Sequence, residues 1–445
     1  MPHSAAQHPP MGWNSWDCYG TTVTEAEVLE NAQVLAERLL PSGWDTVVVD
    51  IQWYEPTARA GGYNTDAPIS YDEDGVQQPA LARFPSAAEG AGFAPLATRV
   101  HELGLRFGLH LMRGIPRRVV AADLPVCDEA GTVVATTAEI ADPASTCSWN
   151  SDNVGLDLTH PGAQVWLDRQ IERIVGWGVD FLKVDDMLAP YHADAIEALH
   201  RAVTRAEERH GHQVLVSLSP GTDLSLAHLG HLRAHADMWR ISDDLWDRWQ
   251  DVHAQLGRLA RWAPHQGPDG WADADMLPLG RIGIRAERGE PRDSLLTADE
   301  QVTLMTLWVI ARSPLMVGGD LPSSDPATIA LLQNADVLAV HADSRGNREI
   351  FREDPLILWT ADGPDGERYV AAFNVGEEEL AVSLDSQDVG LPASLDGEVT
   401  ELWSGRPVPT RKIREQSDAA RGVAPGSTAL DVVIPRHGAV LLAVR

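Results

Sequence analysis

The sequence predicts an α/β protein in which a (β/α)8 TIM barrel is followed by a C-terminal antiparallel β-sandwich domain. Short apolar runs alternate with segments of helical periodicity along most of the chain, which is typical of a parallel barrel. Several of these runs end in a polar or acidic residue, as barrel strands do where they carry chemistry. After about residue 340, short apolar runs with turns between them replace this alternation. We therefore expect a barrel domain over residues 1–340 and a β sandwich over residues 341–445.

The fourth expected barrel strand, over residues 181–187, is representative of the eight. A Trp-Gly-Val-Asp turn over 177–180 leads into an apolar run that ends with Lys183, Asp185 and Asp186. Apolar residues bounded by turn signals are what a strand buried on both faces needs, and charges at its end emerge at one rim of the sheet. The other seven strands are expected over 11–16, 45–51, 105–112, 213–219, 238–244, 273–277 and 314–320.

Helices are expected where apolar residues recur three and four positions apart. The first has Thr24 as its expected N-cap and Pro41 beyond its end. A long polar connection over 54–93 precedes the second helix, and a connection of this length inside a compact domain usually lies over a site. Another irregular stretch covers 113–157. The expected helices span 25–40, 95–103, 164–175, 193–208 and 298–311, and the expected sandwich strands span 357–359, 369–375, 398–403 and 439–444.

The charge and the cysteines exclude several classes of protein. The net charge is −30, with 65 acidic and 35 basic residues, and this charge would repel nucleic acid and anionic membranes. Residues 1–10 contain neither a basic region nor an apolar run, and no stretch is long and apolar enough to cross a bilayer. The chain has three cysteines, Cys18, Cys127 and Cys147, whose spacing is not that of metal ligands. We therefore expect neither a disulfide scaffold nor a cysteine-rich zinc site. We expect a cytoplasmic enzyme without a membrane partner, and a homo-oligomer is left open.

Aromatic and histidine residues are weaker signals. Fifteen tryptophans are many for a chain of this length, and tryptophan faces beside carboxylates suit sugar binding. Trp53, Trp149 and Trp246 are either platforms for a sugar or packing residues. The histidines at 192, 200, 210 and 212 lie on or beside a predicted helix without partners at strand ends, and we expect no metal site there.

Two pairs of adjacent carboxylates end predicted strands. Two carboxylates that face each other across a barrel mouth are the minimum equipment for glycoside hydrolysis. One must be ionised to attack the anomeric carbon, and the other must be protonated to donate to the leaving oxygen. Asp185 and Asp186 are alternatives for the first role, and Asp243 and Asp244 are alternatives for the second. Either pair is alternatively part of a structural salt bridge.

Two cations accompany these carboxylates. Lys183 precedes Asp185 by two residues and therefore lies on the same side of the strand, where its charge helps to keep the carboxylate ionised. Arg240 precedes Asp244 by four residues, and a guanidinium there can orient sugar hydroxyls or carboxylates through paired hydrogen bonds.

Four motifs together resemble glycoside hydrolase family 27 of clan D, whose best-known members are α-galactosidases and α-N-acetylgalactosaminidases. They run in the family's order from about residue 11 to residue 320, and the C-terminal module matches the family's sandwich. The resemblance implies a retaining enzyme that acts on an oligosaccharide or other glycoside and needs no metal or cofactor. The motifs are Met-Gly-Trp-Asn-Ser-Trp at 11–16, Lys-Val-Asp at 183–185, Arg240 with Asp244, and Asp-Ala-Asp-Met-Leu at 273–277.

The resemblance also assigns roles to individual residues. It implies that Asp185 is the nucleophile and Asp244 the acid/base, so that Asp186 and Asp243 become supporting residues. Trp16 matches the aromatic platform beneath the sugar. The other expected sugar contacts are Asp50, Ile51, His110, Trp149, Lys183, Ser219, Arg240 and Asp275.

Several of these contacts depart from the galactosidase pattern. Galactose-specific members usually carry two aspartates after the second strand, which bind the 4- and 6-hydroxyls, whereas this chain has Asp50 and then Ile51. A buried hydroxyl that faces an isoleucine loses its hydrogen-bond partner, which is enough to change substrate preference. His110 stands where a tyrosine is usual, and it is either a hydroxyl ligand or a core histidine. Ser219 replaces the residue that reads the 2-substituent, and Met187 replaces the usual disulfide partner of Cys147.

The leading hypothesis is a retaining exo-acting hydrolase of terminal α-linked pyranosides, similar to α-galactosidases but with altered sugar recognition. An α-glucan or α-glucoside hydrolase of the isomaltosyl type and a β-L-arabinopyranoside hydrolase are alternatives on the same scaffold. An aldolase that uses Lys183 as a Schiff-base nucleophile is disfavoured, because the adjacent carboxylates should raise the pKa of the lysine. A non-catalytic glycan-binding protein is disfavoured because both catalytic carboxylates are present.

Overall fold

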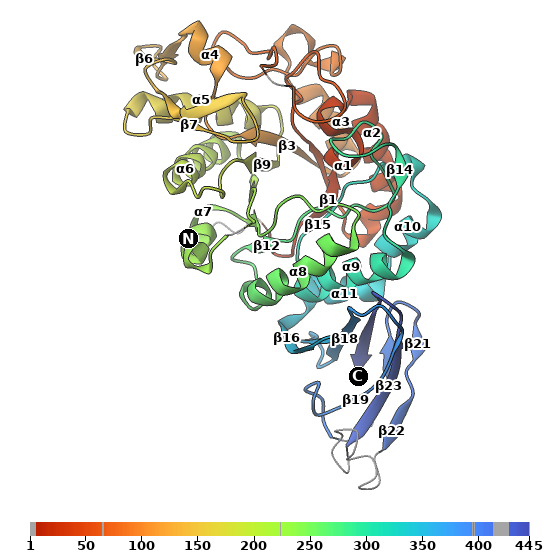
Figure 1. The fold of residues 1–445 in the computed structure, drawn as a ribbon. Helices are drawn as coiled ribbons and strands as arrows, with labels where there is room; N and C mark the ends of the chain where they lie inside the picture. Colours follow the sequence, from red (N-terminus) through yellow and green to blue (C-terminus); the bar gives the residue numbers. More distant parts are fainter. Residues whose placement is uncertain are drawn as a thin grey trace. The chain divides into compact units, whose positions relative to one another are not determined.

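The computed structural model describes residues 6–444 except 65, 223, 394, 396 and 413–426. Eight parallel strands form one sheet (Figure 1). From the first to the seventh, each strand of this sheet lies next to the strand of the same sheet that comes next along the chain. The last strand pairs with the first, and a bridge between Leu277 and Val317 joins it to the seventh, so the sheet closes into the predicted barrel. The strands are β1 (Met11–Asn14), β2 (Thr46–Val49), β3 (Arg106–Met112), β9 (Phe181–Asp185), β10 (Leu215–Leu218), β11 (Met238–Arg240), β12 (Trp271–Asp273) and β15 (Leu315–Val317).

The seventh strand was predicted at 273–277 and forms earlier, at 271–273. The predicted range was wrong because Asp275 has a φ of 89°, a left-handed conformation that an extended strand cannot contain. The buried Trp271 and Ala272, which follow Gly270, form the strand instead.

Each of the five predicted helices is present. Helix α8 was missed although Val252, Leu256 and Leu259 have helical spacing and are buried, so the signal was there. The α-helices are α1 (Trp16–Tyr19), α2 (Glu25–Val34), α3 (Ala94–Glu102), α4 (Arg117–Ala122), α5 (Pro161–Gly176), α6 (Ala193–His210), α7 (Leu229–His235), α8 (Trp249–Trp262), α9 (Ala298–Ala311), α10 (Pro326–Leu332) and α11 (Ala335–Asp343).

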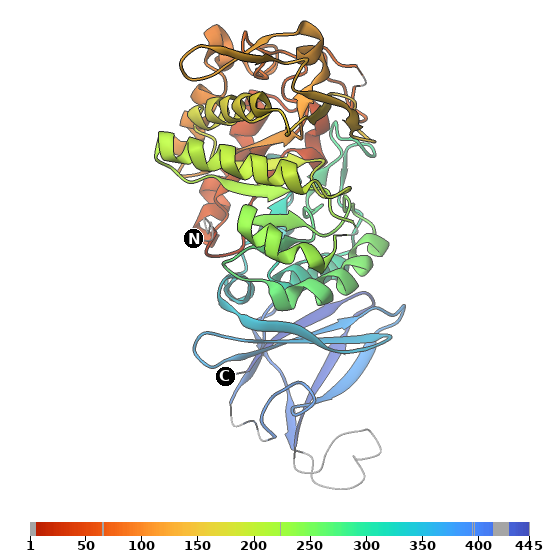
Figure 2. The ribbon, with the colours of Figure 1, turned by 90° about the vertical axis from the view of Figure 1, so that its left-hand side faces the viewer.

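The stretch 113–157, predicted to be irregular, contains short strands and a helix. Its hairpin of β5 and β6 contacts α5, which runs beside α6 in Figure 2. Val126, Ala135 and Trp166 belong to a small apolar cluster of this region. The prediction failed because these strands are short, and the strand over 141–146 has no buried residue and no alternation of apolar and polar side chains. The strands are β4 (Ile115–Pro116), β5 (Pro125–Cys127), β6 (Val133–Thr136), β7 (Ala141–Thr146) and β8 (Asn153–Leu156).

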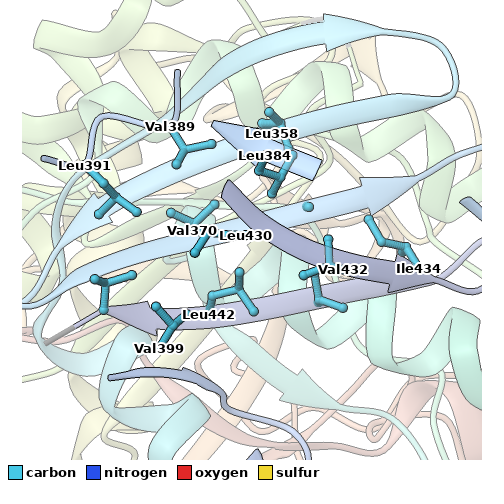
Figure 3. Packing of buried hydrophobic residues seen from close by; sticks show 13 residues of the cluster. Leu358, Val370, Leu384, Val389, Leu391, Val399, Leu430, Val432, Ile434 and Leu442 are labelled. Atoms are coloured by element: carbon cyan, nitrogen blue, oxygen red, sulfur yellow. The ribbon is translucent and has the colours of Figure 1, made fainter. Parts of the chain in front are cut away.

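The C-terminal module is the predicted antiparallel sandwich, with a six-stranded sheet in the order β16-β17-β18-β24-β20-β21 and a three-stranded sheet in the order β19-β23-β22. Figure 3 shows its core, to which both sheets contribute, for example Val370 and Leu442 from the larger and Leu430 from the smaller. The strands are β16 (Arg345–Glu353), β17 (Leu356–Asp362), β18 (Arg368–Asn374), β19 (Leu380–Asp385), β20 (Val399–Glu401), β21 (Arg406–Pro407), β22 (Thr410–Lys412), β23 (Thr428–Ile434) and β24 (Ala439–Val444).

The contacts within the chain divide it into two compact units. The first comprises Met1–Asp244, Pro268–Ser294 and Leu315–Ile329, and it contains the barrel sheet. The second comprises Leu245–Gly267, Leu295–Pro314 and Ala330–Arg445, so that α8, α9 and α11 belong with the sandwich.

In the part of the chain that the structure describes, no helix is long and apolar enough to span a membrane. Two short strands, β13 (Arg281–Ile282) and β14 (Arg292–Asp293), form a hairpin in the first unit.

Candidate active site

Parallel pairing brings the predicted site residues together at the carboxyl ends of the barrel strands. Lys183 on β9 lies opposite His110 on β3, and Arg240 on β11 lies opposite Asp273 on β12. Gly12 is required for the approach of β1 to β2, because an added Cβ would lie 2.3 Å from the carbonyl oxygen of Thr46. All the predicted site residues lie in the first unit, at positions 16, 50, 51, 110, 149, 183, 185, 219, 240, 244 and 275.

Asp185 is held by two side chains from neighbouring strands. The His110 Nε2 atom lies 3.1 Å from its Oδ2 atom, and the Ser219 hydroxyl donates to its Oδ1 atom at 2.8 Å. Burial by itself would raise the pKa of Asp185, but the hydrogen bonds from His110 and Ser219 and the charge of Lys183 hold it well below its usual range. This carboxylate is therefore ionised and ordered, as a nucleophile must be.

Asp186 points elsewhere. Its φ of 62° turns the chain directly after β9. Its Oδ2 atom accepts hydrogen bonds from Arg113 Nε at 3.0 Å and Nη2 at 2.7 Å, and the side chain is buried. Of the two adjacent carboxylates, the geometry thus leaves Asp185 beside Lys183, while Asp186 forms a buried ion pair.

Lys183 forms a buried ion pair with Asp50. Its Nζ atom lies 2.7 Å from Asp50 Oδ2, which also accepts a hydrogen bond from the Asn14 amide at 2.7 Å. Burial lowers the pKa of the lysine, but the charges of Asp50 and Asp185 outweigh it and raise that pKa above its usual range. Burial likewise raises the pKa of Asp50, yet Lys183 and His110 bring it below the usual value. A raised lysine pKa is the opposite of what a Schiff-base nucleophile needs.

Arg240 binds two carboxylates at once. Its Nη1 atom lies 2.7 Å from Asp275 Oδ1, and its Nη2 atom lies 3.2 Å from Asp244 Oδ1. The Asp244 side chain is 35% exposed, whereas that of Asp275 is 5% exposed, so Asp244 is the carboxylate of this group that solvent and a leaving group can reach. Asp243 is exposed and accepts a hydrogen bond from the backbone N–H of Asp244 at 3.0 Å, which is a supporting position.

An aromatic row lies beside these charges. Tyr63 stacks on Trp16 with ring centroids 5.3 Å apart, and the ring centroid of Trp149 lies 5.2 Å from that of Tyr63. Trp53, in contrast, is fully buried and donates its N–H to the carbonyl oxygen of His110, so it is a packing residue. Trp246 is also buried, and it belongs to the second unit.

Sequence reasoning missed Tyr63, Asp17 and Glu287. Burial raises the pKa of Tyr63, and the negative charges of Asp185 and Asp244 raise it further. The tyrosine hydroxyl therefore lies near both candidate catalytic groups. The only signal was the long stretch 54–93, which was expected to lie over a site and which supplies this tyrosine.

Asp17 and Glu287 are additional carboxyl groups near Asp244. Burial raises the pKa of Asp17, with further increases from Asp275 and Asp244, and its Oδ2 atom has no hydrogen-bond partner among the described residues. Burial also raises the pKa of Glu287, and the Asp244 charge adds to this effect. Both groups therefore release their protons less readily than a carboxyl group in water does. Asp17 follows the Trp16 motif directly, whereas the position of Glu287 had no signal in the sequence.

The cysteines agree with the predicted absence of a disulfide at Met187. Cys18, Cys127 and Cys147 all lie within the described ranges, and each is a free thiol. Met187 is 2% exposed, so the segment after β9 is held by packing.

Removing the Ser219 hydroxyl is expected to move the acid limb of activity. Ser219→Ala deletes a hydrogen bond that favours ionised Asp185, so the pKa of that carboxyl rises and the acid limb of kcat/KM shifts to higher pH. A pH profile of kcat/KM measures this shift. Ser242→Ala is the control, because that hydroxyl donates to the carbonyl oxygen of Ala274. An acid limb that stays in place in Ser219→Ala contradicts the expected coupling.

A (β/α)8 barrel with two carboxylates and their cationic partners at the strand ends defines the class of this protein, a glycosidase. Residues 152–343 match the family model described as alpha galactosidase A, and residues 353–444 match the alpha galactosidase C-terminal beta sandwich domain. A family 27 β-L-arabinopyranosidase from Geobacillus stearothermophilus is 41% identical, with a TM-score of 0.90 over 99% of this chain and 96% of that one. The chain belongs to glycoside hydrolase family 27.

Other relatives have different substrates in their names. A Bacillus halodurans protein whose assignment as an α-N-acetylgalactosaminidase is provisional is 39% identical, with a TM-score of 0.84 over 100% of this chain and 99% of that one. The alpha-galactosidase of Cyamopsis tetragonoloba is 26% identical over 89% of this chain and 80% of that protein. The comparisons thus define the family and leave the sugar to be argued from the site.

Proposed function

We propose that this protein is a retaining exo-glycosidase that hydrolyses terminal β-L-arabinopyranosides in preference to α-D-galactopyranosides. The observation that carries the proposal is Ile51. It directly follows Asp50, whose carboxylate accepts the backbone N–H of Ile51 at 2.8 Å, and its side chain is 1% exposed. The second aspartate that galactose-specific members present at this point is absent here.

The two sugars differ where Ile51 would matter. β-L-Arabinopyranose has the ring hydroxyl arrangement of α-D-galactopyranose but no hydroxymethyl group on C5. An α-galactoside would bury its 6-hydroxyl against an apolar side chain without a hydrogen-bond partner, which costs about 1–3 kcal/mol. An arabinopyranoside has no such hydroxyl and loses nothing. The Geobacillus relative, a β-L-arabinopyranosidase, supports this choice.

The proposed mechanism is a double displacement. The ionised carboxylate of Asp185 attacks the anomeric carbon, while Asp244 donates a proton to the leaving oxygen. Asp244 then removes a proton from the water that attacks the glycosyl ester, which releases the sugar with retained configuration and regenerates Asp185. His110 and Ser219 orient the nucleophile, because both hydrogen-bond to it.

The remaining residues would bind the sugar. Lys183 and Asp50, held together at 2.7 Å, present a donor and an acceptor to ring hydroxyls beside Asp185. Arg240 and Asp275 likewise present a donor and an acceptor to the sugar, on the side where Asp244 lies. Trp149 is partly exposed and offers a ring to the apolar face of a pyranoside, whereas Trp16 is 4% exposed and stacks on Tyr63.

An α-D-galactoside or α-N-acetylgalactosaminide is the second candidate substrate, and the two other relatives favour it. The small Ser219 side chain would leave room for a 2-substituent, but its hydroxyl is already engaged with Asp185. An α-glucoside of the isomaltosyl type remains a third possibility of the scaffold. The aldolase alternative is disfavoured by the raised pKa of Lys183.

The test compares kcat/KM for p-nitrophenyl β-L-arabinopyranoside, α-D-galactopyranoside, α-N-acetylgalactosaminide and α-glucoside. We expect the arabinopyranoside to be preferred over the galactoside by about 10- to 100-fold, the factor equivalent to the lost hydrogen-bond partner. Ile51→Asp should narrow or reverse this ratio, whereas the control Ile51→Val should keep it. A galactoside preference in the parent chain contradicts the assignment of the sugar, and activity on none of the glycosides contradicts the function itself.

We propose that catalysis belongs to the barrel domain, residues 1–340, and that residues 341–445 form an accessory module. Cytoplasmic location and assembly into homo-oligomers stay predictions from the sequence.

A further inference from the structure

Three side chains that the proposed mechanism does not use converge on the outside of the barrel. Glu197 lies on α6, and His231 and His235 lie on α7, which Figure 1 shows next to α6. One potential ligand atom from each of the three lies within 4.8 Å of the others. The two histidines are four residues apart, so both rings project from the same face of the helix.

Hydrogen bonds orient the His235 ring for metal binding. Its Nδ1 atom lies 2.7 Å from the carbonyl oxygen of His231, which can only accept. Nδ1 must therefore carry the proton, and Nε2 keeps its lone pair. A backbone carbonyl that fixes the tautomer of an imidazole in this way is a usual outer partner of a metal ligand.

Tyr191 orients the ring of His231. The His231 Nδ1 atom lies 2.7 Å from the Tyr191 hydroxyl, and its Nε2 atom points toward Glu197 Oε1 at 3.4 Å. A tyrosine hydroxyl can both donate and accept, so this contact fixes the orientation of the ring and leaves its tautomer open. Nε2 of His231 faces the Glu197 carboxylate, and an ion bound between them would take the place of the proton that the two groups share.

We propose that Glu197, His231 and His235 bind a divalent transition metal, with zinc as the best fit. Two imidazole nitrogens and one carboxylate oxygen form one of the donor sets that zinc accepts, and a fourth position would be taken by water. Soft thiolate ligands are absent from the trio, and two imidazoles disfavour magnesium and calcium, which prefer oxygen donors.

The groups around the trio permit this binding. Arg201 Nη1 lies 3.7 Å from Glu197 Oε2, but both side chains are nearly half exposed, and such a surface ion pair holds the carboxylate weakly. Glu197 also lines a cavity of about 780 Å³, together with Tyr191 and His192, so its carboxylate can be reached from solvent. A bound ion would join α6 to α7 and stabilise the native state by an amount that grows with the logarithm of its concentration relative to Kd.

This inference departs from the sequence-based expectation of no metal, which considered other histidines. It does not depend on the proposed function, because none of the three residues takes part in the catalytic arrangement.

The experiment uses the full chain without a histidine tag, stripped with a chelator and titrated with Zn²⁺ by calorimetry. We expect one ion per chain and a Zn²⁺-dependent rise in Tm. Co²⁺ should give the visible absorption of a site with nitrogen and oxygen ligands. His235→Ala should bind Zn²⁺ at least about 100-fold more weakly and lose the rise in Tm. The control is His253→Ala, an exposed histidine outside the cluster, which should behave as the parent.

Glu197→Gln is a second variant that keeps the side-chain volume and should weaken binding without loss of fold. Glycosidase activity in the absence of metal reports that each variant is folded. Binding of equal strength in the parent and in His235→Ala, or no binding in the parent, overturns the proposal.

Discussion

Asp185→Ala is expected to lower kcat on the order of 10⁴-fold or more on every glycoside, because in the proposed mechanism this carboxylate forms the glycosyl ester. Asp186 cannot take over, since Arg113 holds it in a buried ion pair at 2.7 Å. Asp244→Ala should behave differently. It should lose about 10²- to 10⁴-fold on alkyl glycosides, whose leaving groups need a proton, and much less on nitrophenyl glycosides.

The two variants are therefore distinguished by how strongly their loss of activity depends on the leaving group. The measurement is kcat/KM on an alkyl glycoside and on a nitrophenyl glycoside of the same sugar. Azide should restore turnover to Asp244→Ala by replacing the water that needs a general base. Asp243→Ala is the matched control, because that exposed neighbour only accepts the Asp244 N–H and should keep nearly full activity. Near-normal turnover in Asp185→Ala, or equal losses in Asp243→Ala and Asp244→Ala, would contradict the assigned roles.

Arg113→Met is expected to destabilise the barrel by about 3–5 kcal/mol, because it leaves the Asp186 carboxylate buried without its cation. The Arg113 and Asp186 side chains are 6% and 4% exposed, so water cannot compensate. The double variant Arg113→Met with Asp186→Asn should recover much of the loss, since the charge is removed and asparagine tolerates the φ of 62°.

Thermal and denaturant unfolding measure this effect. Arg99→Met is the control, because its pair with Glu25 spans 3.6 Å and the arginine is 56% exposed, so about 1 kcal/mol or less is expected. Equal losses in Arg113→Met and Arg99→Met would show that the buried pair has no special role. A double variant less stable than Arg113→Met would mean that the guanidinium acts through contacts other than Asp186.

Much of the barrel was predictable because its signals are local. A buried parallel strand needs an apolar run of a few residues, and each of the eight strands has one. The seventh was displaced because Asp275 adopts a left-handed conformation beside Arg240, which depends on a residue 35 positions away. The polar strand β16 in the sandwich, Arg-Gly-Asn-Arg-Glu-Ile-Phe-Arg-Glu, carried no alternation to detect.

Some residues of the candidate site could also be predicted from the sequence, and others could not. The carboxylates and cations at strand ends were visible from the chain, whereas Tyr63 and Glu287 come from connections whose paths follow no periodicity. The expected contact of Ser219 with the sugar stays a prediction, and the structure adds a hydrogen bond from its hydroxyl to Asp185 that the sequence did not indicate.

The sequence alone was enough to predict that charged residues meet at one rim of a barrel, because parallel strands all present their carboxyl ends on the same side. It also determined that Ile51 stands beside Asp50, from which the proposed sugar follows. Strand spacing left Asp185 and Asp186 as alternatives, the family resemblance favoured Asp185, and the folded chain supplies a physical reason for that preference. That choice depends on the turn after β9 and on Arg113, a cation more than 70 residues away, which takes one carboxylate and leaves the other to His110 and Ser219.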